Sequence, residues 1–133
     1  MKIENIKFKA KRLDGKGWVE GSLIRSTTGI KERAYIVDNF SSMSDYSVIG
    51  VDPSTVCQFT GMKDEKGNEI WEGDLVNERY DIASIDNLYE VVYIEEEGCF
   101  AFKDIDNADN CQPFVNLVDT FVVGNKSDKE NKV

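Results

Sequence analysis

Residues 58–76 read QFTGMKDEKGNEIWEGDLV, and this stretch decides the fold class that the sequence predicts. Strand-forming residues stand on both sides of Asp64-Glu65-Lys66-Gly67-Asn68, whose members tolerate tight turns. The pattern predicts a β-hairpin across this turn. A second turn is expected at Gly73, because glycine allows a sharp bend and Asp74 can hydrogen-bond the backbone of the bend.

A similar pattern lies on the N-terminal side of this stretch. Isolated apolar residues alternate with lysines over residues 6–11, which is the period-two pattern of a strand with one buried face. Asp14-Gly15-Lys16-Gly17 provides turn residues, and residues 18–25 resume a strand-like run. These segments predict an N-terminal hairpin.

The remaining strands are short and separated by turns rich in Gly and Asp. They are expected over residues 34–37, 47–51, 55–60, 75–80, 88–95, 99–103 and 120–123. The only helical pattern covers a turn or two around residues 113–119. The sequence therefore predicts a mainly β protein, in which several short antiparallel hairpins form a small barrel or a strongly bent sheet with little helix.

Length and composition set the domain organisation. With 133 residues, 41% of them hydrophobic, the chain can bury one core. We expect a single β domain over residues 1–125, or two subdomains with a boundary near residue 50, followed by a flexible tail over 126–133. Since no apolar stretch is long enough for a membrane span and no signal-peptide block begins the chain, a cytoplasmic location is expected.

Charge is divided unevenly along the chain. Residues 1–50 hold nine Lys and Arg against six Asp and Glu, a balance of +3, whereas residues 51–133 hold seven against nineteen, a balance of −12. The basic residues near the N-terminus could be a solvated strand face or a phosphate-binding surface, and the first interpretation is favoured. They are Lys2, Lys7, Lys9, Lys11, Arg12 and Lys16.

The sequence lacks the residues that several kinds of catalysis and metal binding require. The chain has no histidine, which removes the commonest general base and metal ligand, and it has no glycine-rich phosphate loop. Asp104 to Asn110 is rich in acidic residues but does not fit a calcium loop, since a central glycine is missing and Val115 occupies the position of the bidentate glutamate. We therefore expect no enzyme activity, no cofactor and no metal.

The three cysteines have no metal-binding or redox spacing. Each of Cys57, Cys99 and Cys111 is expected to be a small buried apolar residue without a disulfide partner.

Residues 51–76 resemble the signature stretch of the YopX family of bacteriophage and prophage proteins. The resemblance lies in the order of a Thr-Gly pair, a lysine–aspartate turn with glycine, an aromatic residue, Glu-Gly-Asp and two apolar residues. Residues 122–125, Val-Val-Gly-Asn, resemble the closing element of those proteins. One departure is Cys57, where many relatives would carry glycine. The resemblance implies a β-rich fold with a barrel-like part and self-association in the bacterial host cell, but no activity.

Three functions follow as hypotheses. The first is an interaction protein that binds itself, or a host or phage protein, with Glu69, Trp71, Glu72 and Asp74 as the candidate surface on the rim of a turn. The second is an acidic mimic of nucleic acid that inhibits a host enzyme. The third, which the net charge of −9 disfavours, is nucleic-acid binding through the basic N-terminal strand.

Overall fold

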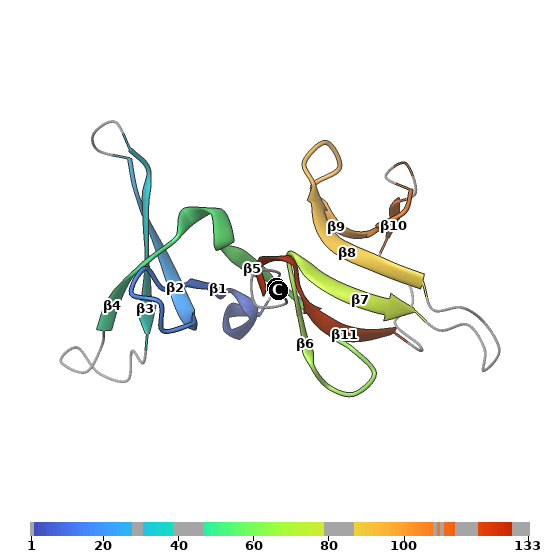
Figure 1. Ribbon diagram of the computed structural model, residues 1–133, viewed down its shortest axis with the longest axis horizontal. Helices are drawn as coiled ribbons and strands as arrows, with labels where there is room; N and C mark the ends of the chain where they lie inside the picture. Colours follow the sequence, from blue (N-terminus) through green and yellow to red (C-terminus); the bar gives the residue numbers. More distant parts are fainter. Residues whose placement is uncertain are drawn as a thin grey trace. The chain divides into compact units, whose positions relative to one another are not determined.

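The structure is a computed structural model, which describes residues 2–27, 31–38, 47–78, 87–107, 109, 111–113 and 120–128. It is mainly β and antiparallel, as the sequence predicts (Figure 1). The chain divides into two compact units, Met1–Phe59 and Thr60–Val133, called unit 1 and unit 2 below. The division falls later than the predicted boundary near residue 50, because Cys57 and Gln58 pair with Lys9 and Phe8 and so belong to unit 1.

Unit 1 holds four strands and the beginning of a fifth. They are β1 (Phe8–Lys11), β2 (Trp18–Ser26), β3 (Arg33–Asp38), β4 (Ser47–Val51) and β5 (Cys57–Lys63), with short 3-10 turns at Ile3–Asn5 and Pro53–Thr55. Their order in the sheet is β4-β3-β2-β1-β5. The predicted N-terminal hairpin is confirmed, since Lys11 pairs with Trp18 and Phe8 with Gly21.

The core of unit 1 is made by one face of these strands. It consists of Ala10, Val19, Ala34, Ile36 and Val51, with Phe8, Leu23, Ile49 and Val56 packed against it. The strand predicted over residues 6–11 is confirmed over Phe8–Lys11, where Ala10 is fully buried between the half-buried Lys9 and Lys11. The opposite face of these strands, called the outer face below, carries the residues between the core positions.

Strand β2 changes its partner at its midpoint. Residues up to Gly21 pair with β1, and residues from Ser22 pair with β3. The backbone of β3 comes so close here that a Cβ atom on Gly21 would overlap the carbonyl oxygen of Val37. Glycine is therefore required at this position for space.

The end of β1 and the residues just after it also form hydrogen bonds with the end of β4. Arg12 forms an isolated antiparallel bridge with Val51, and the Asp52 amide donates to the Lys11 carbonyl over 2.9 Å. The Leu13 amide donates to the Gly50 carbonyl over 3.1 Å. These bonds connect the first and last members of the β1–β4 series.

Unit 2 contains the end of β5 and six further strands. They are β6 (Glu69–Trp71), β7 (Asp74–Glu78), β8 (Asn87–Ile94), β9 (Cys99–Asp104), β10 (Cys111–Pro113) and β11 (Thr120–Asn125). Strand β6 is next to β5, and the others are ordered β10-β9-β8-β7-β11. The predicted hairpin across residues 64–68 is confirmed, and the predicted strands over residues 88–95 and 99–103 pair as β8 and β9.

The core of unit 2 consists of Ile70, Val76, Tyr89, Val91 and Phe102. The rings of Tyr89 and Phe102 lie 6.1 Å apart and tilted by 45°. Because Tyr89 is buried, this aromatic residue belongs to the core and offers no interface.

The structure differs from several of the predicted elements. No pattern in the sequence predicts β10, because this strand has three residues and ends in Pro113, which cannot continue an inner strand. Lys126 and Ser127, which the predicted tail included, are hydrogen-bonded, since the Lys126 amide donates to the Gly73 carbonyl and the Ser127 amide to the Asn125 side chain. The predicted helical turn around residues 113–119 lies outside the described residues except for Pro113, which ends β10. Residues 39–46, Tyr80 and residues 129–133 also lie outside them. The barrel or bent sheet remains a prediction.

No helix among the described residues is both long enough and apolar enough to cross a membrane.

Replacing Gly21 by alanine tests the close approach of β2 and β3. The added methyl group must displace the Val37 carbonyl, so we expect Gly21→Ala to lower the free energy of unfolding by about 1–3 kcal/mol. Gly124→Ala in β11 is the matched control, because no atom lies within 4 Å of its added Cβ. Urea unfolding of both variants measures the difference, and equal stabilities would contradict the prediction.

Candidate functional site: buried aspartates and the outer face of unit 1

The four residues predicted to form an interaction surface do not share one environment. Trp71 is 4% exposed and Asp74 is 2% exposed, so neither side chain reaches the surface. Glu69 and Glu72 are half-buried. The rim interpretation is therefore wrong for Trp71 and Asp74, because the turn at Gly73 folds both residues inward, and it remains a prediction for the two glutamates.

Asp74 fixes the turn between β6 and β7. One carboxylate oxygen accepts the Trp71 amide over 2.7 Å, which confirms that this aspartate bonds the backbone of its own turn. The other oxygen accepts the side-chain amide of Asn125 over 3.0 Å. Gly73 adopts a positive φ of 86°, which favours glycine, and its carbonyl accepts the Lys126 amide.

Asp64 fixes the turn between β5 and β6. One carboxylate oxygen accepts the backbone amides of Lys66 and Asn68 over 2.9 and 2.8 Å. The other accepts the Asn68 side chain over 3.1 Å and the Val122 amide over 3.0 Å. Burial by itself would raise the pKa of Asp64, but these four hydrogen bonds outweigh it and hold the pKa below its usual value.

Both aspartates therefore connect residues 58–76 to β11. Asp64 bonds Val122, 58 residues away, and Asp74 bonds Asn125, 51 residues away. The Glu65 amide adds a bond to the Thr120 carbonyl over 3.4 Å. The two sequence elements that resemble the YopX family are thus the two partners of one hydrogen-bond network, whose role is structural.

The outer face of unit 1 carries a row of lysines. Lys9 and Lys11 in β1, and Lys7 just before it, alternate with the core residues Phe8 and Ala10. Period-two alternation places the three lysines on the same side of the sheet.

Aromatic rings lie beneath these lysines. The ammonium nitrogens of Lys9 and Lys11 lie 4.8 and 5.6 Å from the ring centroid of Trp18, and that of Lys7 lies 4.8 Å from the ring centroid of Phe59. Trp18 is half-buried, whereas Phe59 is buried. Sequence reasoning found the lysines but missed the two rings, because the pairing of β1 with β2 and β5 had to be known first.

The carboxylate of Glu20 faces this row. Glu20 pairs with Lys9 in the sheet, and its carboxylate lies 3.3 Å from the Lys7 ammonium. The three lysines, Trp18 and Glu20 are called the lysine–tryptophan row below.

The same outer face continues as an apolar patch on β2, β3 and β4. Val37 pairs with Val48, and Ile24 pairs with Tyr35 one row further along (Figure 1). Ile24 is 46% exposed and Val48 is 53% exposed. A hollow of about 490 Å³ adjoins Tyr35, and its walls include Leu13, Arg33, Gly50 and Pro53.

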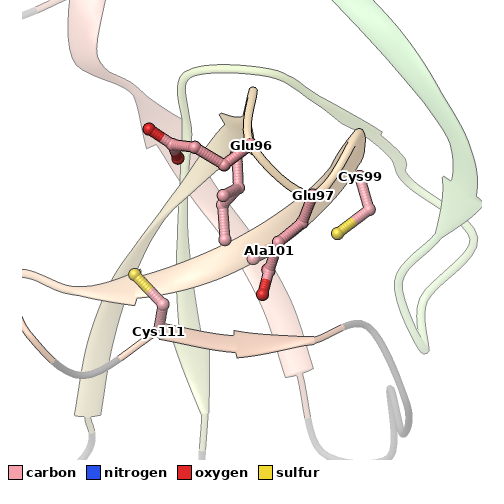
Figure 2. A pocket seen from close by; sticks show the side chains of 6 residues that line it. Glu96, Glu97, Cys99, Ala101 and Cys111 are labelled. Carbon is pink, nitrogen blue, oxygen red and sulfur yellow. The ribbon is translucent and has the colours of Figure 1, made fainter.

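Unit 2 has a hollow of about 500 Å³ that contains two thiols. Figure 2 shows Glu96, Glu97, Cys99, Ala101 and Cys111 around it, with the two sulfur atoms well apart. Among the described residues, no three acidic or thiol groups are placed to hold a metal ion.

The environments of the cysteines correct one prediction and confirm another. None of the three cysteines is in a disulfide, and Cys57 is buried as expected, but Cys99 and Cys111 are exposed because each is the first residue of its strand. Cys57 lies in β5 opposite Lys9, so no turn is needed at the position where relatives would carry glycine.

The fold and the aspartate network define a mainly β, two-unit protein whose signature residues are structural. The YopX family model, described as YopX protein, matches residues 7–128. The chain belongs to the YopX family. No curated protein matches it significantly.

Asp64→Asn tests the network. The side-chain NH₂ group of the new asparagine would face backbone N–H groups that need an acceptor. We therefore expect the free energy of unfolding at pH 7 to fall by about 2–3 kcal/mol. Because the folded pKa of Asp64 lies below its usual value of about 3.9, this stabilisation is present above that value and disappears as pH falls through the folded pKa.

Urea unfolding between neutral and acid pH, followed by tryptophan fluorescence, measures this effect. The gap between the wild type and Asp64→Asn should shrink at acid pH, and a gap independent of pH would contradict the assignment. Asp106→Asn, which changes an exposed carboxylate, is the matched control and should leave stability unchanged.

Proposed function

We propose that this protein is a non-enzymatic interaction module of phage or prophage origin, which acts in the bacterial cytoplasm and self-associates. The observation that supports it best is the apolar patch on the outer face of unit 1. Single exposed apolar side chains are common on protein surfaces, but a contiguous group is typical of interaction sites. Here Ile24, Tyr35, Val37 and Val48 come from three neighbouring strands.

The patch has the form that a protein partner can use. It lies on paired strands, so its side chains are held by the sheet and lose little freedom on binding. Tyr35 supplies an aromatic ring at its border with the adjoining hollow, and aromatic residues are enriched in interface centres. A second copy of this chain is the partner proposed here.

We also propose that unit 1 is barrel-like, in agreement with the expectation from the family resemblance. The support is the bridge between Arg12 and Val51, which brings the end of β1 back to β4 after three antiparallel pairings. A barrel-like sheet has one face filled by its own core and the other free to bind.

The acidic mimic remains a second proposal. Unit 2 contains seven Lys and Arg against eighteen Asp and Glu, a net charge of −11, whereas unit 1 contains nine against seven, a net charge of +2. The exposed Glu95, Glu96 and Glu97 lie in the turn between β8 and β9. The same charge also serves solubility, so it favours the mimic less than the patch favours self-association.

Substitution of the patch tests self-association. Light scattering coupled to size-exclusion chromatography should give the wild type a defined multiple of 15.1 kDa that persists on dilution. The double variant Ile24→Ser and Val48→Ser should shift the mass to that of one chain, because the serines remove the apolar area that a second copy would cover.

The control replaces two residues of matched exposure in unit 2. Ile105 is 46% exposed and Val123 is 54% exposed, so Ile105→Ser with Val123→Ser removes similar exposed side chains elsewhere. This variant should assemble as the wild type does. A wild type that has the mass of a single chain at micromolar concentration would overturn the proposal.

A further inference from the structure

We infer that the lysine–tryptophan row is a binding site for single-stranded nucleic acid. The inference is independent of self-association, because it rests on β1 and the start of β2 rather than on the apolar patch. Its members are Lys7, Lys9, Lys11, Trp18 and Glu20.

The three charges are presented together by one strand. Phe8 and Ala10 are held in the core of unit 1, so the alternation of β1 fixes Lys7, Lys9 and Lys11 in a line on the outer face. Affinity for phosphate depends on how many cations one surface presents together. A line of three is suited to the backbone of one extended strand.

The rings order this line before any ligand arrives. Lys9 and Lys11 both lie over Trp18, and Lys7 lies over Phe59, at distances typical of cation–π contacts. These contacts hold long, flexible side chains along the sheet, which reduces the conformational entropy lost on binding. The row is therefore more than a set of solvated lysines.

Trp18 identifies the class of anion. It lies directly opposite Lys11 in the sheet and is half-buried, and the ammonium groups of Lys9 and Lys11 lie over its ring, so a base stacks on the indole only after phosphates draw these ammonium groups away. Single-strand binding sites combine cations that follow the backbone with rings on which unpaired bases stack. An acidic protein would use the lysines but would gain nothing comparable from the indole, and the bases of a duplex are not available for stacking.

Two features limit the affinity. The Glu20 carboxylate partly neutralises the charge of Lys7, with which it forms an ion pair. Unit 2 carries a net charge of −11, which repels any nucleic acid. Binding should therefore be weak at physiological salt and strong only at low salt. Removing the Glu20 charge should strengthen it.

Fluorescence anisotropy of labelled oligo(dT), about 20 nucleotides long so that it covers a typical site, tests the inference on the full chain at several salt concentrations. Lys7→Gln with Lys9→Gln and Lys11→Gln should weaken binding about tenfold or more. The same variant should reduce the slope of log affinity against log salt by about 2, since each phosphate contact contributes about 0.7. Glu20→Gln should tighten binding.

The control removes three lysines from unit 2. Lys63→Gln with Lys66→Gln and Lys103→Gln changes the net charge equally, and it includes a matched cation–π pair, since the Lys66 ammonium lies 5.0 Å from the Phe121 ring centroid. It should weaken binding much less than the change in the row. Equal losses from the two triple variants would overturn the inference, because they would reflect net charge alone.

Trp18 separates stacking from charge. Trp18→Leu should weaken oligo(dT) binding about 5- to 100-fold with the salt slope unchanged, and Trp18→Phe should restore most of it, because a phenyl ring can still stack. Thermal unfolding confirms that each variant is folded.

Three further results would overturn the inference. They are absence of binding by the wild type at low salt, equal affinity for a duplex of the same length, and equal competition by poly-L-glutamate. The last would assign the row to acidic proteins.

Discussion

Two buried carboxylates hold unit 2 together, and the rest of that unit depends on them. Asp64 and Asp74 each close a turn in the chain before β7, and each also bonds β11 near the other end of the sequence. A buried carboxylate is stable only when hydrogen bonds replace the water that it loses. The network therefore forms only when both turns and β11 are in place. The closing strand β11 is thus needed to stabilise the two turns.

This constraint explains what the family signature does. The Glu-Gly-Asp segment looks like a candidate for chemistry because acidic residues stand beside an aromatic residue, yet Asp74 is 2% exposed and fully engaged by Trp71 and Asn125. A carboxylate that is buried and hydrogen-bonded in this way does not reach a ligand. We propose that the residues that meet a partner lie instead on the outer face of unit 1, to which the signature contributes Cys57 and Phe59 of β5.

The sequence predicted most of the strands because their patterns are local. Alternation over residues 6–11 and the turn at 64–68 needed only neighbouring residues, and β4 began and ended as expected. The predicted interaction surface was wrong where pairing between distant residues decides which side chains are exposed. Nothing near Trp71 indicates that Asn125 covers its turn, and nothing near Lys9 indicates that Trp18 lies beneath its ammonium group. The spacing of residues in the sequence predicts on which face of a strand a side chain lies, but not which element packs against that face.

The outer face of unit 1 combines two surfaces that favour different partners. Its apolar part on β2 to β4 gains free energy by excluding water, which depends little on salt, whereas its lysine part gains by releasing counterions, which depends strongly on salt. Because both parts share one sheet, a ligand on the lysines could adjoin a partner on Val48 without displacing it. Assembly through the patch would repeat the row once per copy, so several weak rows could hold one nucleic-acid strand more firmly than a single row does.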